Sequence, residues 1–208
     1  MMTFGLVISS YKYGHLASHC IETILAQTKP FDKVYFVDDG VGDCKHLPSI
    51  YPKIEYTFRD KNLGVVQNFQ NMLERVETDY VMFLGADNWL RSDALESIAK
   101  KVTGFSEVVT YDIMITGEQK NDVSIHYPLE THEINGDIYW KREKKHHGSM
   151  LYDVKMALSV GGYGHNGGIR SDEDLNLWTK LVNNGVKIEY VSEALLFYRR
   201  HKENFNKY

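Results

Sequence analysis

Acidic side chains stand at three places in the sequence where they could share one site. Asp38 and Asp39 follow one apolar run, Asp87 follows another, and three acids stand together at residues 172–174. Carboxylate oxygens suit Mg²⁺ and Mn²⁺, whose charge offsets that of phosphates. A carboxylate also accepts strong hydrogen bonds from N–H donors and serves as a general base. The three groups therefore predict cation binding, ligand recognition and proton transfer at one site.

Each of these groups also has a purely structural explanation. Asp and Gly favour tight turns, which accounts for Asp38 and Asp39 before Gly40. Acids in the first turn of a helix are favoured by the helix dipole, which accounts for residues 172–174. A helix cap would account for Asp87, although its place after a buried strand favours the ligand interpretation. For the run at 172–174, spacing alone favours the structural explanation.

Strands and helices alternate through the first half of the chain and would position these acids. Strands are predicted at 3–9, 33–37, 54–58 and 80–84, with helices at 15–27, 65–76 and after residue 92. This alternation implies a mostly parallel sheet covered on both faces. Such sheets bind ligands at the carboxyl ends of their strands. Those ends are predicted at 9–11, 38–40 and 85–88, where the polar side chains gather.

The second half of the chain is less regular. Its sequence predicts strands at 107–116, 122–126, 186–191 and 195–198, and helices at 153–160 and 172–183. We find no internal repeat and no proline-rich linker, so we predict a single α/β domain over residues 1–208. The pattern GxGxxG at 162–167 lacks the preceding strand that a dinucleotide site needs, and a flexible glycine loop explains it better.

Composition excludes several classes of function. The formal net charge is -4, which gives no global basic field for nucleic acid, so no nucleic-acid partner is expected. The two cysteines, Cys20 and Cys44, lack zinc-ligand spacing. No apolar stretch approaches the roughly 20 residues of a membrane helix, and the N-terminus lacks a signal-peptide pattern. We therefore expect a cytoplasmic protein without a transmembrane segment.

Five segments of the chain resemble family 2 of the glycosyltransferases with the GT-A fold. They are VISSYKYGHLASHCIETILAQT, FDKVYFVDDGVGD, NLGVVQNFQNML, DYVMFLGADNWL and SDEDLNLWTKLVNNGVKIEYVSEALLFYRRH, in the order of the family. A narrower resemblance is to capsid-glycosylating transferases of large algal viruses, which would place the protein in the host cytoplasm. The family resemblance implies a nucleotide-binding half up to about residue 90 and an acceptor-side half from about residue 91.

The resemblance implies an inverting transfer of a hexose from a UDP-sugar to a hydroxyl group of a glycan or glycoprotein, with Mn²⁺ or Mg²⁺. The metal motif of the family has the form DxD, often with a further acid, but this chain has Gly85 and Asn88 at the flanking positions. Asp87 is then the one anionic ligand of the motif. His201, in the YRRH segment, is a second candidate ligand, and a surface histidine near the tail explains it equally.

The resemblance also assigns the remaining site residues. Asp38 is favoured as the acceptor for the uracil imide, Asp39 has a lesser role, and Tyr11 would stack on the base. Asp174 matches the general base of the family, with Glu173 and Asp172 beside it. Other candidates near the nucleotide are Ser9, Arg59, Asn62 and Gly64, of which Arg59 is equally well explained as an exposed loop arginine. The cleft for donor and acceptor would include Ala86, Asn88, Trp89 and His147.

Two other functions remain open from the sequence. A module that binds a nucleotide sugar without catalysis would explain the depleted metal motif. A nucleotidyltransferase would need a glycine-rich N-terminal loop with Arg and Lys to meet a triphosphate, and the loop here offers only Lys12.

Overall fold

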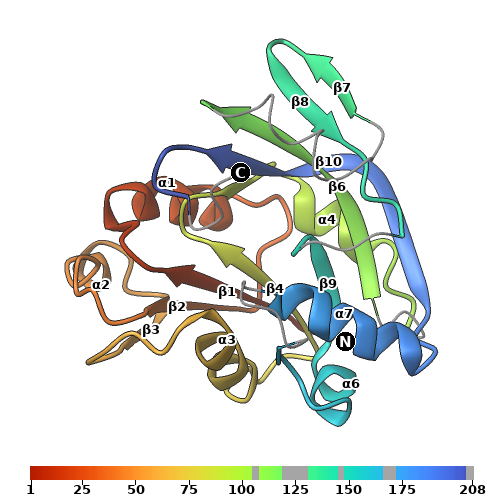
Figure 1. Cartoon of the computed structure of the whole chain (residues 1–208), viewed down its shortest axis with the longest axis horizontal. Coiled ribbons are helices and arrows are strands. Elements are labelled where there is room, and N and C mark those ends of the chain that lie inside the picture. Colours follow the sequence, from red (N-terminus) through yellow and green to blue (C-terminus); the bar gives the residue numbers. More distant parts are fainter. Residues whose placement is uncertain (105–107, 119–130, 145–147, 166–171, 205–208) are drawn as a thin grey trace.

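The computed structural model in Figure 1 describes residues 1–104, 108–118, 131–144, 148–165 and 172–204. These ranges form a single mixed sheet with helices on both faces, in the order β3-β2-β1-β4-β9-β6-β10-β5. The α/β class predicted from the sequence is confirmed. No helix in these ranges has both the length and the apolar character needed to cross a bilayer.

The strands of the first half pair in parallel, as predicted. They are β1 (Phe4–Ser10), β2 (Lys33–Asp38), β3 (Glu55–Phe58) and β4 (Tyr80–Gly85). Ser9 is in register with Val37 of β2 and with Gly85 of β4. The three central strands therefore end at one level, and the polar residues that follow them meet at one edge of the sheet.

Three helices connect these strands, and a fourth follows them. They are α1 (Gly14–Leu25), α2 (Leu47–Ile50), α3 (Val65–Leu73) and α4 (Ala94–Ala99). Leu6 and Ile8 of β1 belong to the same core cluster as α1 and α4, whereas Val7 belongs to the cluster of α3. This alternation follows from the two-residue period of a strand, which sends neighbouring side chains to opposite faces.

The second half is mixed rather than parallel. A short strand, β9 (Met150–Asp153), runs antiparallel between β4 and β6 (Val108–Gly117). The two strands predicted at 186–191 and 195–198 are one strand, β10 (Ile188–Arg200), with register shifts between Val191 and Leu196. The strand predicted at 122–126 lies outside the described residues. The other elements are β5 (Trp89–Leu90), β7 (Thr131–Ile134), β8 (Asp137–Trp140), α6 (Val154–Ser159) and α7 (Glu173–Asn183).

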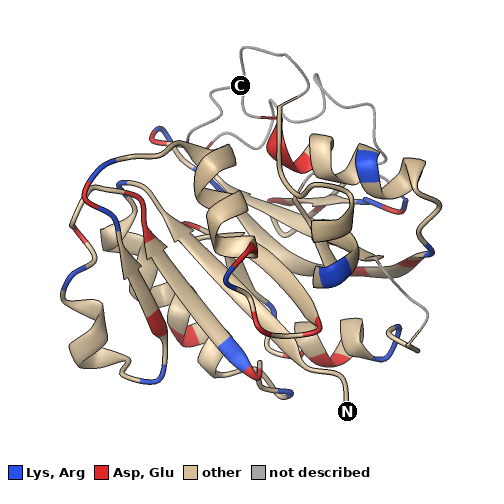
Figure 2. Cartoon of the chain, turned by 90° about the horizontal axis from the view of Figure 1, so that it is seen from below, with Lys and Arg blue, Asp and Glu red and all other residues tan. Residues whose placement is uncertain are grey.

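Basic and acidic residues are interspersed along the ribbon in the view of Figure 2, rather than separated by sign.

Asp112 is a fully buried acid of the sheet. The carboxylate of Asp112 on β6 accepts hydrogen bonds from the hydroxyl groups of Tyr139 and Tyr190, both at 2.6 Å, and from the main-chain N–H of Arg142 at 2.7 Å. It thereby ties β8 and β10 to β6.

Replacement of Asp112 by Ala is expected to lower the free energy of unfolding by about 3 kcal/mol, because several buried donors lose their acceptor together. Urea denaturation followed by circular dichroism measures this change. Asp112→Asn is the matched control: it keeps one acceptor oxygen, so it should cost less. A loss below about 1 kcal/mol for the Ala variant would show that water replaces the carboxylate.

Candidate active site

A cleft of about 890 Å³ opens at the carboxyl ends of β1, β2 and β4. Its floor includes Ser9 and Gly85, and one wall comes from Asn62, Gly64 and Asn68 at the start of α3. The opposite end is formed by Asp87 and the chain segment after β10, residues 202–204. The cleft lies where an open parallel sheet is expected to bind ligands.

The two acids at the end of β2 have different surroundings. The Asp38 carboxylate accepts the main-chain N–H groups of Val41 and Gly42, each at 2.9 Å, and therefore stabilises its own turn. Asp39 lines the cleft, and Asp38 is not among the lining residues. Of the two acids, the structure therefore places Asp39, and not the favoured Asp38, at the cleft. Neighbouring residues at a strand end point in opposite directions, so only one of the two can face the cleft.

The Asp39 carboxylate is held by several donors. It accepts the main-chain N–H of Leu63 at 3.0 Å and the side-chain amide of Asn62 at 3.2 Å, and the Nε of Arg59 lies 3.7 Å away. Burial raises the pKa of Asp39, while the N–H groups of Leu63 and Gly64 and the charge of Arg59 lower it. These contacts hold the Asp39 carboxylate in place as a hydrogen-bond acceptor at the cleft wall.

Arg59 does not line the cleft, but it contacts Asn68, which does. Its side chain is only 10% exposed, and its Nε donates to the Oδ1 of Asn68 at 2.7 Å. Asn68 in turn donates to the Oγ of Ser9 at 3.1 Å. Arg59 was predicted near the nucleotide, but it does not line the cleft, and it is too buried to be the exposed loop arginine that the sequence also allowed. Asn68, which lines the cleft, was not predicted. A polar side chain on the buried face of a predicted helix was the signal that could have identified it.

Tyr11 lies at the cleft mouth in the loop between β1 and α1. It is 39% exposed, and the Nζ of Lys12 lies 5.0 Å from its ring centre. Lys12 has a φ of 68°, a left-handed backbone conformation that is uncommon for residues other than Gly or Asn. Both residues line the cleft, so an aromatic face and a cation are available to a ligand there.

The far end of the cleft is built around Asp87, which is 5% exposed. Its Oδ2 lies 3.2 Å from the Nε2 of His201 and 3.1 Å from the Nδ2 of Asn204. Adjacent ligands of an octahedral ion with bonds near 2.1 Å are separated by about 3 Å. The Asp87 and His201 atoms thus have a spacing that suits one small divalent cation.

The positions that flank Asp87 supply no further carboxylate and have other contacts. A side chain at Gly85 would place its Cβ 2.6 Å from the Oδ1 of Asp87, so the carboxylate of Asp87 fills that space. The Oδ1 of Asn88 accepts the main-chain N–H of Arg199 at 2.9 Å and fastens the loop to β10. Asn88 also lines the cleft, as predicted.

Two of the predicted cleft residues lie elsewhere. The side chain of Ala86 is fully buried in the hydrophobic core, because it points away from the cleft at the strand end. Trp89 stacks on Phe197 with ring centres 5.3 Å apart and lies beneath the guanidinium of Arg199, so it packs β5 on β10 and does not line the cleft. His147 lies outside the described residues.

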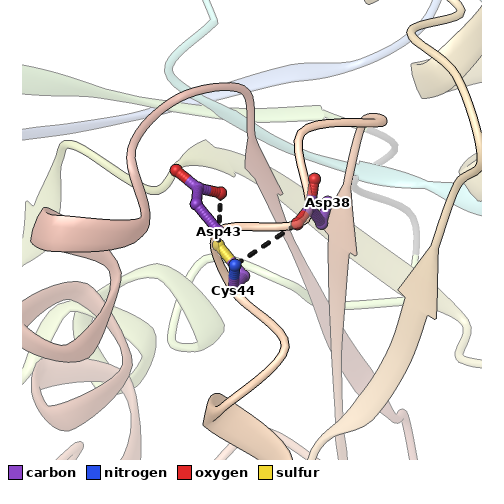
Figure 3. Close-up of side chains that lie close together, drawn as sticks. All are labelled: Asp38, Asp43 and Cys44. Carbon is purple, nitrogen blue, oxygen red and sulfur yellow. Dashed lines mark hydrogen bonds between the residues drawn. The ribbon is translucent and has the colours of Figure 1, made fainter.

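A second group of potential ligands, Asp38, Asp43 and Cys44, is shown in Figure 3. Asp38 is already engaged by its turn, and Asp43 accepts the main-chain N–H of Gly14 at 3.0 Å. Burial raises the pKa of the Cys44 thiol to about 12, which opposes formation of the thiolate that binds metal. This group stabilises the loop after β2 and is a poorer cation site than Asp87 with His201.

The three acids at the start of α7 also separate. Glu173 lines the cleft, whereas Asp172 and Asp174 are not among the lining residues. Asp172, at the helix N-cap, lies 3.4 Å from the Nδ1 of His165. The carboxylate of Asp174 lies against Gly148, where an added Cβ would be 2.7 Å from Oδ2. Burial, and then the charge of Glu173, raise the pKa of Asp174 to about 8, while buried Arg142 lowers it.

The segment after β10 contains the residues that the sequence did not reveal. Lys202, Glu203 and Asn204 line the cleft, although the sequence suggested only a polar tail there. The hydroxyl of Tyr13 donates to the main-chain oxygen of Glu203 at 3.3 Å, which holds the segment against the loop after β1. These residues have no hydrophobic periodicity. The one signal that the sequence offered is that they directly follow His201.

Comparison with known proteins identifies relatives of the chain. A family model described as glycosyl transferase family 2 matches residues 6–170. An uncharacterised glycosyltransferase of Haemophilus influenzae is 23% identical over 95% of this chain and 76% of that protein. The putative teichuronic acid biosynthesis glycosyltransferase TuaG of Bacillus subtilis is 23% identical over 94% of this chain and 78% of that protein.

Solved structures share the fold. Residues 1–349 of S. aureus TarS in complex with UDP-GlcNAc superpose with a TM-score of 0.76 at 17% identity, covering 98% of this chain. The same TarS fragment in complex with UDP gives a TM-score of 0.75 at 18% identity over 96% of this chain. This chain spans only about 60% of the TarS fragment.

Proposed function

The chain belongs to glycosyl transferase family 2, and from this premise we propose that it transfers a hexose from a UDP-sugar to a hydroxyl group of a glycan or glycoprotein, with inversion at the anomeric carbon. The observation that carries the proposal is the cleft itself. A fixed carboxylate, Asp39, lines the cleft after β2, and Asp87 lines it after β4, with the Nε2 of His201 3.2 Å from the Oδ2 of Asp87. Such an arrangement suits a ligand with a hydrogen-bond donor on its base and a diphosphate at its far side.

The nucleotide end of the cleft is assigned to Asp39 and Tyr11. Asp39 accepts the imide N–H of uracil, because a charge-assisted hydrogen bond is about twice as strong as a neutral one. Tyr11 stacks on the base, and Asn62 and Gly64 keep the Asp39 carboxylate in place. UDP is favoured as the carrier because the TarS structures with the same fold hold UDP and UDP-GlcNAc.

Asp87 and His201 are assigned to Mn²⁺ or Mg²⁺, which offsets the charge of the departing diphosphate when it is bound. The first half of the chain thus supplies the nucleotide contacts and Asp87, and the second half supplies His201 and the base. Asp174 is proposed as that base. The acceptor oxygen forms a bond to the anomeric carbon as the bond to the diphosphate breaks, and Asp174 takes the hydroxyl proton.

Release of free UDP from a panel of UDP-sugars, with Mn²⁺ or Mg²⁺ and without added acceptor, tests this function. Slow hydrolysis of the donor is expected even when the acceptor is unknown. Binding of UDP-sugar without any hydrolysis would favour a binding module, which the missing acids at Gly85 and Asn88 make the main alternative. Release of pyrophosphate from a nucleoside triphosphate and a sugar phosphate would favour a nucleotidyltransferase instead.

Replacement of Asp39 by Asn is expected to weaken UDP binding about 10- to 100-fold, because a hydrogen bond to a charged group contributes roughly 1.5–3 kcal/mol. Isothermal titration calorimetry without metal measures this effect. Asp43→Asn is the matched control, since it removes a negative charge from the same loop without touching the cleft. Equal affinity of the Asp39 variant and the wild type would show that the base lies elsewhere.

A further inference from the structure

The segment that follows β10 forms a reciprocal turn from His201 to Asn204. The main-chain N–H of Asn204 donates to the oxygen of His201 at 3.0 Å. The main-chain N–H of His201 donates in return to the Oδ1 of Asn204. Asn204 is only 4% exposed, although it lies close to the C-terminus. Its side chain is therefore fixed by its own turn.

These contacts determine which way the Asn204 amide faces. The oxygen must meet the N–H of His201, and the nitrogen donates to the main-chain oxygen of Arg199 at 3.0 Å. The reversed orientation would set oxygen against oxygen and N–H against N–H. The second N–H of the amide therefore points to the Oδ2 of Asp87, 3.1 Å away. Asn204 presents a donor to this carboxylate, not a further ligand oxygen.

Asp87 needs such support because the loop after β4 offers no other carboxylate. Gly85 has no side chain, and the Oδ1 of Asn88 is used by the main chain of Arg199. We propose that Asn204 is a positioning residue that holds the Asp87 carboxylate beside the His201 imidazole, so that one acid suffices to bind the divalent cation. This inference rests on the proposed function, because it assigns the cation site of the same cleft.

The affinity of the protein for Mn²⁺ tests the inference without a turnover assay. Electron paramagnetic resonance of free Mn²⁺, in the presence of saturating UDP, gives the dissociation constant. Asn204→Ala is expected to weaken Mn²⁺ binding about tenfold, the effect of one charge-assisted hydrogen bond. Binding of UDP without metal should stay within about twofold of the wild type, because Asn204 contacts Asp87 and Arg199 and not Asp39. Retained UDP binding also shows that the variant is folded.

Tyr13→Phe is the matched control. It removes the hydroxyl that donates to the main-chain oxygen of Glu203, another contact of the same turn, without touching Asp87. The control should bind Mn²⁺ like the wild type. If Mn²⁺ binding weakens equally in both variants, the inference is overturned. The turn would then matter only because it packs against the loop after β1, and not because Asn204 contacts Asp87. Unchanged Mn²⁺ affinity in Asn204→Ala would overturn it as well.

If Asn204→Ala does not fold, Asn204→Gln replaces it, since the longer amide cannot meet Arg199, His201 and Asp87 together. It should also weaken Mn²⁺ binding, and an unchanged affinity would count against the inference. A wild-type protein that binds UDP but no Mn²⁺ overturns this inference and leaves nucleotide binding intact. A wild-type protein that binds neither overturns the proposed function.

Discussion

Replacement of Asp174 by Asn is expected to reduce sugar transfer about 10²- to 10⁴-fold, the usual contribution of a general base. The amide has nearly the same shape but cannot take the proton of the acceptor hydroxyl. The dissociation constant for UDP should stay within about twofold, because Asp174 is not among the residues that line the cleft. Steady-state kinetics of UDP release, together with calorimetry, separate the two effects.

The pH dependence of the wild type gives an independent check on the same residue. Burial and the charge of Glu173 raise the pKa of Asp174 to about 8. A base works only when it is deprotonated, so the rate should rise with pH through about 8 and level off above it. Below that pH the carboxyl group holds its proton and the rate falls. The variant should lose this rise.

Two neighbouring acids serve as controls for Asp174. Asp172→Asn should change the rate less than about threefold, because the Asp172 carboxylate lies at the N-cap of α7, 3.4 Å from the Nδ1 of His165. Glu173→Gln is the critical comparison, since Glu173 lines the cleft wall. If Glu173→Gln abolishes transfer and Asp174→Asn retains it, Glu173 is the base and the assignment of Asp174 is wrong.

The position of the cleft was predictable from the sequence because strands and their ends have clear signals. Apolar runs followed by polar residues marked the ends of β1, β2 and β4, and the register confirms that these ends lie side by side. Ser9 and Asp39 accordingly both line the cleft at this edge of the sheet. The sequence could not decide between Asp38 and Asp39. Adjacent residues point in opposite directions, and the end of a strand does not reveal which of the two faces the cleft.

The second half was harder to predict because its elements are short or lack a period. The four residues of β9 form an antiparallel strand where no strand was predicted. Asn204 belongs to a turn stabilised by its own hydrogen bonds, and such turns have no hydrophobic pattern. Its partner Asp87 is more than a hundred residues away in sequence. Contacts of this kind arise only when the sheet has assembled.

Replacement of Asp87 by Asn is expected to weaken Mn²⁺ binding more than tenfold and to reduce transfer about 10²- to 10³-fold, because the charge that develops on the departing diphosphate is less well stabilised. Asp87 is the acid of the loop after β4, and no second carboxylate of that loop replaces it. Binding of UDP without metal should be unchanged or slightly tighter, since a negative charge near the diphosphate is removed.

Asp93→Asn is the matched control for Asp87. It removes the same charge shortly after the same loop, but Asp93 is paired with Arg91 outside the cleft, so transfer and Mn²⁺ binding should not change. Chelation of divalent ions by EDTA should reduce wild-type transfer to the level of Asp87→Asn, with little further effect on the variant. If EDTA leaves the wild type active and Asp87→Asn transfers sugar normally, the contacts of Asp87 with His201 and Asn204 only stabilise the fold. The diphosphate charge would then have to be offset by the cations at the cleft mouth, of which Lys12 and Lys202 line it.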